Sequence, residues 1–129
     1  MINQQLRIRR HAPPAKSRLL SAVMTYLPDA WFSPSSKELV SLYRLRYKMA
    51  LDDRKYDSAL IFLNKILEVE PLNLEAKLSK AELYHRHLND YGSAVENYNK
   101  VIRLSQQTPA SAVHLQARES LSELMEMLS

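Results

Sequence analysis

A block of twelve residues that begins at Tyr56 recurs 35 residues later, beginning at Tyr91. A repeat of this period is typical of stacked helix pairs, because one pair alone cannot bury its apolar face and a neighbouring copy must cover it. The repeat predicts an all-α fold, built as a solenoid of antiparallel helix pairs. The residue types that are identical in the two copies are Tyr56/Tyr91, Ser58/Ser93, Ala59/Ala94, Asn64/Asn99 and Lys65/Lys100.

The composition narrows the chemistry that the chain can perform. Gly92 is the single glycine among 129 residues, so phosphate cradles of the P-loop or dinucleotide type are excluded, and long connections through left-handed backbone are not expected. The chain has no cysteine, which excludes disulfides, thiolate zinc sites and thiol nucleophiles. No apolar stretch approaches the roughly 20 residues needed to span a bilayer. We therefore expect a soluble protein with short loops.

Positive charge is concentrated at the start of the chain. Five basic residues precede Asp29, the first acidic one, so residues 1–28 carry +5, whereas the rest hold 13 basic and 14 acidic side chains. Pro13 and Pro14 favour extended backbone, which predicts a basic, extended arm over residues 1–14. The basic residues that could contact a partner are Arg7, Arg9, Arg10, Lys16 and Arg18.

The next segment, residues 15–35, combines a short helix with a loop. Apolar residues recur at helical spacing up to Leu27, and Pro28 ends the pattern, which predicts a helix over about 15–27. Prolines and serines then indicate a loop that ends before residue 36. Trp31 and Phe32 lie in this loop, where they either anchor a partner or, the alternative we favour, pack on the start of the following helix.

The remaining residues, 36–129, read as one helical domain. Ser35 and Glu38 form a capping box that starts a helix over about 36–53, and Asn73 can cap a helix over 74–88. Their partners are helices over 56–68 and 91–104, so the repeats span 36–71 and 72–108. A last helix follows Pro109 and should cap the core over residues 109–129. Its apolar stripe is Val113, Ala117, Leu121, Leu124, Met125 and Leu128.

The spacing within both copies resembles the tetratricopeptide repeat family over roughly residues 40–128. In its first helix the family places a small residue and, three residues later, a tyrosine. In its second helix it places a tyrosine, an alanine three residues later, an aromatic or large apolar residue four further on, a small residue after three more, and a proline after another five. The residues that match are Tyr56, Ala59, Leu63, Ile66 and Pro71 in the first copy, and Ala81, Tyr84, Tyr91, Ala94, Tyr98 and Val101 in the second.

The resemblance implies a concave groove, lined by the first helix of each pair, that holds a segment of a partner protein. The positions that match this face are Ser41, Arg44, Lys48, Glu75, Leu78, Glu82 and His85. A clamp for a C-terminal carboxylate is not supported, because Lys48 stands where asparagine is expected and Leu78 and Glu82 supply no donor. For each charged residue taken singly, the simpler interpretation is a solvated helix face.

Nothing in the spacing of polar residues predicts catalysis. His85 and His87 lie two residues apart, which directs them to different faces of a helix, and His11 and His114 have no obvious companions. We therefore expect no metal site, no cofactor and no enzymatic activity.

The sequence predicts a protein–protein interaction module, either an adaptor, an assembly factor or a chaperone. Association with itself or with a larger assembly would help so small a core. The alternative is contact with nucleic acid or an anionic membrane through the basic arm, which would be unspecific because residues 1–25 contain no aromatic side chain to stack on a base. We take the cytoplasm as the default location, with organellar targeting by the arm left open.

Overall fold

The computed structural model of the protein describes residues 33–129. The predicted arm over residues 1–14, the predicted helix over 15–27 and both aromatic residues of the loop lie outside this part of the chain. In residues 33–129 the chain forms five helices, whose bounds agree with the predicted ranges to within a few residues. They are α2 (Ser36–Asp52), α3 (Tyr56–Val69), α4 (Leu74–Arg86), α5 (Tyr91–Leu104) and α6 (Ala112–Leu128).

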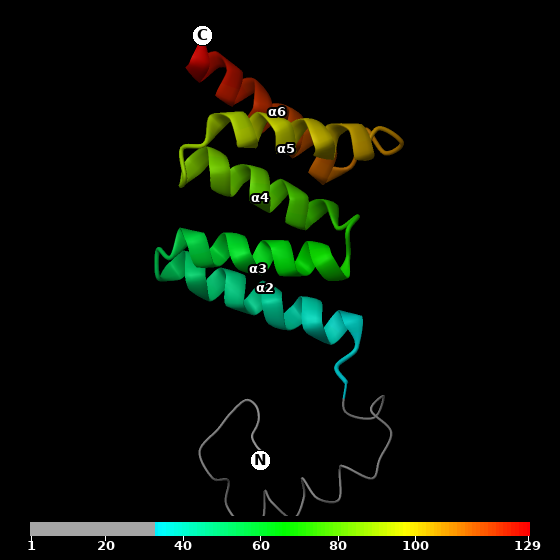
Figure 1. The fold of residues 1–129 in the computed structure, drawn as a ribbon. Coiled ribbons are helices and arrows are strands. Elements are labelled where there is room, and N and C mark those ends of the chain that lie inside the picture. The colour runs from blue at the N-terminus through cyan, green and yellow to red at the C-terminus, as the bar shows by residue number, and fades with distance from the viewer. Residues whose placement is uncertain (1–32) are drawn as a thin grey trace, which may run out of the picture. The chain divides into compact units, whose positions relative to one another are not determined.

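The five helices pack in sequential antiparallel pairs. Helix α2 packs on α3 and α4 packs on α5, while α3 joins the two pairs by its contact with α4. Helix α6 packs on α5 and also reaches α4. From α2 in cyan to α6 in red, the helices follow one another in chain order (Figure 1). The all-α prediction and the predicted pairing are therefore confirmed.

Polar side chains fix where the helices begin. The Ser35 hydroxyl accepts a hydrogen bond from the Glu38 backbone N–H at 3.1 Å, and the Glu38 carboxylate accepts one from the Ser35 N–H at 2.9 Å. This is the predicted capping box, which satisfies two backbone donors that no helical carbonyl can reach. The side chains that cap the starts of α4, α5 and α6 are Asn73, Asp90 and Ser111.

The internal repeat extends to the backbone. Helices α3 and α5 are both 14 residues long and begin 35 residues apart. Two residues before each of them, Arg54 and Asn89 adopt left-handed backbone with φ of 58° and 53°. Long left-handed connections were not expected in a chain with one glycine, but a single left-handed residue occurs at each of these two short turns. Neither is glycine, since Gly92 has no positive φ and lies inside α5. Asparagine tolerates left-handed backbone better than arginine does.

The repeat also shows where the first copy lacks a stabilising contact. Lys55 precedes α3 and makes no side-chain cap, whereas its equivalent Asp90 accepts a hydrogen bond from the Ser93 N–H at 3.1 Å. We expect Lys55→Asp to raise the free energy of unfolding by about 1 kcal/mol, because it supplies a cap and places a negative charge at a helix N-terminus. The melting temperature followed by circular dichroism should rise by about 4–8 °C. The reciprocal Asp90→Lys should lower it, and an unchanged melting temperature in Lys55→Asp would contradict the equivalence of the two turns.

Two clusters of apolar side chains form the core, and α4 contributes to both. Ala76 and Leu83 of α4 belong to the cluster between α2 and α3, whereas Leu78 and Ala81 of the same helix belong to the cluster with α5 and α6. The largest fully buried side chain of the first cluster is Leu63, and that of the second is Tyr98. These two residues occupy equivalent positions of the repeat.

The first and the last described helices both expose apolar side chains. Three apolar residues of α2 remain exposed at helical spacing, with 43% of Leu42, 56% of Leu45 and 53% of Met49 accessible. Helix α6 exposes Glu119, Ser122 and Glu126, but also Leu115 and Met127, which are 55% and 54% accessible. Met125 and Leu128, which were expected to face the core, are each 51% exposed, so the buried stripe of α6 ends at Leu124.

Candidate functional site

The first helices of the two pairs, α2 and α4, border a hollow of about 220 Å³. Leu63 and Ile66 of α3 form its floor, and both are almost fully buried. We call this cavity the α2–α4 hollow. The residues that line its walls are Arg44, Tyr47, Lys48, Asn73, Glu75, Ala76 and Ser79. The structure thus brings three of the predicted groove residues, Arg44, Lys48 and Glu75, to one place.

The basic wall of the α2–α4 hollow carries charge that no neighbouring side chain neutralises. Arg44 and Lys48 are exposed on α2. The one ion pair within residues 33–129 joins Arg86 to Glu123, and none of the hydrogen bonds between described residues involves the side chain of Arg44 or Lys48. Glu75 lines the same hollow from α4, beyond ion-pair distance of both. The hollow therefore offers two free cations above an apolar floor.

The basic wall continues towards the start of α2. A second hollow, of about 250 Å³, is lined by Lys37, Val40, Ser41, Arg44 and Glu70. Arg44 lines both hollows, so the two openings adjoin along α2. Ser41, the third predicted groove residue of this helix, is exposed at the second opening.

Tyr47 and Ser79 connect the two walls of the α2–α4 hollow. Burial raises the pKa of the Tyr47 phenol, while a hydrogen bond with Ser79 acts in the opposite direction. The phenol is therefore neutral at physiological pH, where it can donate or accept a hydrogen bond. Neither Tyr47 nor Ser79 was among the predicted groove residues. Tyr47 could have been identified as part of the site from its position at the edge of the core-facing side of α2.

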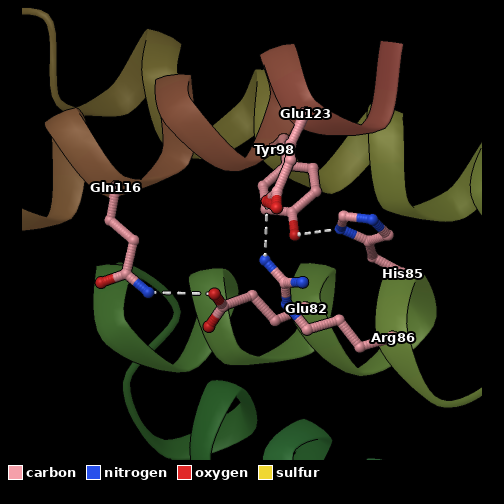
Figure 2. A network of polar contacts seen from close by, with 6 residues as sticks. All are labelled: Glu82, His85, Arg86, Tyr98, Gln116 and Glu123. Atoms are coloured by element: carbon pink, nitrogen blue, oxygen red, sulfur yellow. Dashed lines mark hydrogen bonds and ion pairs between the residues drawn. The ribbon is translucent and has the colours of Figure 1, made fainter. Parts of the chain in front are cut away.

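On the other side of α4, helix α6 contacts the predicted groove residue Glu82 and its neighbour Arg86. Glu82 accepts a hydrogen bond from the Gln116 side chain at 2.9 Å, and Arg86 lies 3.1 Å from Glu123 (Figure 2). Leu78 is only 6% exposed, although it lines a shallow hollow of about 340 Å³ between these helices together with Glu82. This half of the predicted groove is thus partly covered by the chain itself.

His85 lies in the core and not on the accessible face. It is 8% exposed, and its Nδ1 lies 3.0 Å from the hydroxyl of Tyr98 on α5 (Figure 2). Burial lowers the pKa of His85, and the charge of Arg86 adds to this effect, so the ring is neutral at neutral pH. Burial also raises the pKa of Tyr98 to about 12, and the charge of Glu82 adds to this effect. The expected groove position of His85 is therefore corrected, because Tyr98 needs a buried polar partner.

A second buried pair, Ser105 and His114, joins the end of α5 to α6. The Ser105 hydroxyl donates to the Val101 carbonyl at 2.7 Å and lies 2.7 Å from Nδ1 of His114. Since the hydroxyl proton is directed at the carbonyl, the ring N–H donates to Ser105. Ser105 and His114 are 1% and 4% exposed. A serine nucleophile needs the opposite polarity and access to substrate, so this pair holds two helices together.

The other predicted contact residues cannot be placed on this surface. Arg7, Arg9, Arg10, Lys16 and Arg18, together with Trp31 and Phe32, precede the residues that the structure describes. Within residues 33–129, no group of three or more histidine, aspartate or glutamate side chains is arranged to hold a metal ion. None of the helices in this part of the chain is both long and apolar enough to cross a membrane.

Comparisons with known proteins found no relative for the chain: no family model, no curated protein and no solved structure matches it.

Proposed function

We propose that residues 33–129 form a protein-interaction module, similar to tetratricopeptide repeats, that binds a segment of another protein between α2 and α4. The observation that carries the proposal is the α2–α4 hollow itself, where Arg44 and Lys48 stand free above the apolar floor of Leu63 and Ile66. Apolar contact area supplies binding free energy and a few placed polar groups orient the ligand, which is the usual composition of a recognition site.

The repeated backbone supports the same function. Equal lengths of α3 and α5, and equivalent turns at Arg54 and Asn89, support the interpretation of α2 and α4 as corresponding elements of two copies. Such repeats present a continuous surface along the first helices of successive pairs, and these surfaces bind extended or helical segments. Adaptors, assembly factors and chaperones all use surfaces of this kind.

Selection of peptides from a random display library on the full-length protein tests the proposal. Ser79→Trp places a large side chain in the α2–α4 hollow, and we expect it to abolish binding of the selected peptides. Asn99→Trp is the matched control, because Asn99 is exposed on α5, away from the hollow. Circular dichroism of both variants checks that they fold.

The same experiment tests the alternative function of the basic arm. Peptides that bind equally well to Ser79→Trp and to the parent protein would contradict recognition in the hollow. Binding of the protein to heparin or to acidic vesicles could also be lost when residues 1–12 are deleted but kept in Ser79→Trp. Contact through the basic arm would then explain the function better than recognition in the hollow.

A further inference from the structure

We propose, resting on the function proposed above, that the segment bound between α2 and α4 is acidic, with carboxylates on alternate residues that meet a row of cations along α2. This basic stripe consists of Lys37, Arg44 and Lys48. The three positions are seven and four residues apart, so they share one face of the helix. At about 1.5 Å per residue they extend over about 16 Å of its length.

The basic stripe differs from an ordinary solvated helix face in two respects. Its three side chains line two adjoining hollows, and these have apolar residues beneath them, Val40 in one and Leu63 with Ile66 in the other. None of the three is in an ion pair with a residue of the described part. A carboxylate placed between these cations would be partly screened from water, where a charged hydrogen bond is stronger than on an open surface.

The acidic residues near the basic stripe do not neutralise it. Glu38 on the same helix is held by the capping box with Ser35. Glu70 accepts a hydrogen bond from the Asn73 side chain at 2.8 Å, and Glu75 stands on the opposite wall. The cations are therefore available to a ligand, while Glu75 would repel negative charge on the side of the ligand that faces α4, and Glu70, at the end of α3, would repel it in the second hollow.

This division of charge between the walls defines the ligand. In an extended segment, alternate side chains point in opposite directions, and two residues advance by about 6.6 Å. Arg44 and Lys48 lie about 6 Å apart along the helix axis. Carboxylates on alternate residues can thus meet Arg44 and Lys48, while the intervening residues, neutral or basic, face Glu75. The planar fork of the arginine is suited to both oxygens of one carboxylate.

The same division of charge disfavours a nucleic acid at this site. A phosphate backbone carries charge at every nucleotide and cannot turn a neutral side towards Glu70 and Glu75. Residues 33–129 contain 13 basic and 13 acidic side chains, so there is no general positive potential to draw in a polyanion. A peptide with charge on one side only fits the two walls.

Fluorescence anisotropy with the full-length protein tests the acidic ligand. The probes are a labelled peptide in which glutamate alternates with serine, the same peptide with glutamine in place of glutamate, and a labelled DNA duplex. We expect the glutamate peptide to bind at least about tenfold more tightly than the glutamine peptide. Arg44→Glu/Lys48→Glu should remove this preference.

The matched control is Lys100→Glu/Arg103→Glu, which changes the net charge equally at two exposed positions of α5. It should retain the preference for the glutamate peptide. Equal loss in both double variants would overturn the inference, because the preference would then reflect net charge alone. The inference would also be overturned if the DNA duplex bound tightly to the parent protein and not to Arg44→Glu/Lys48→Glu. The basic stripe would then be a nucleic-acid site.

Failure of this inference can be told apart from failure of the proposed function. One outcome is that Ser79→Trp abolishes binding of the library peptides, but these peptides are not enriched in acidic residues. This outcome would contradict the acidic ligand and would still support the protein-interaction module. If every selected peptide bound Ser79→Trp as well as the parent protein, both the acidic ligand and the proposed binding in the hollow would be overturned.

Discussion

Replacing Tyr98 with alanine is expected to lower the free energy of unfolding by about 3–5 kcal/mol, the usual cost of removing a large buried aromatic side chain. Tyr98 is fully buried in the second core cluster, and its ring meets the edge of His85 with ring centres 5.9 Å apart. The substitution leaves a cavity and also removes the hydrogen-bond partner of His85 Nδ1. Since small domains are stable by only about 5–15 kcal/mol, this loss is a large share of the total, and the variant should unfold at a clearly lower urea concentration than the parent protein.

Urea unfolding followed by circular dichroism measures this loss, and two further variants divide it into parts. Tyr98→Phe keeps the ring but leaves His85 without its partner, so we expect a cost of about 1–3 kcal/mol. Asn99→Ala changes the exposed neighbour and should alter stability by less than about 0.5 kcal/mol. If Tyr98→Ala cost no more than Tyr98→Phe, the aromatic ring would not be the anchor of the second cluster.

Leu63→Ala is expected to cost about 2–5 kcal/mol, because the leucine is 1% exposed at the centre of the first cluster. The same residue forms part of the floor of the α2–α4 hollow, so its truncation also enlarges the candidate binding site from below. Urea unfolding again provides the measurement, with peptide binding assayed below the midpoint of the transition.

Ile61→Ala is the matched control for Leu63→Ala, since it removes a side chain of the same size from the same helix at a position that is 54% exposed. We expect it to cost well under half as much. Similar losses for the two variants would show that burial in the first cluster is not what stabilises α3.

The helices and their caps could be predicted from the sequence because their causes are local. The capping box of Ser35 and Glu38 needs residues three apart, and the cap at Asn73 likewise acts within one turn. Of the candidate site, Arg44, Lys48 and Glu75 were predicted together because the resemblance to tetratricopeptide repeats implied a groove lined by the first helix of each pair.

The polar groups of the core could not be predicted in this way. His85 pairs with Tyr98 and His114 pairs with Ser105, and in each case the partner belongs to a different helix or its end. Helical periodicity shows which face a residue occupies but not what the facing helix supplies there. Arg54 shows a similar limit, since its left-handed backbone is imposed by the turn between two packed helices and not favoured by arginine itself.

Helix α4 forms one wall of the α2–α4 hollow, and its remaining sides hold both core clusters. Ala76 and Leu83 are packed on one side, and Leu78 and Ala81 on another. A ligand that presses on Glu75 or Ser79 therefore meets a helix that cannot tilt without loosening the whole bundle. The entropy of ordering this wall is already lost when the chain folds, so binding would have to order only the bound segment and the exposed side chains of Arg44 and Lys48 on the opposite wall.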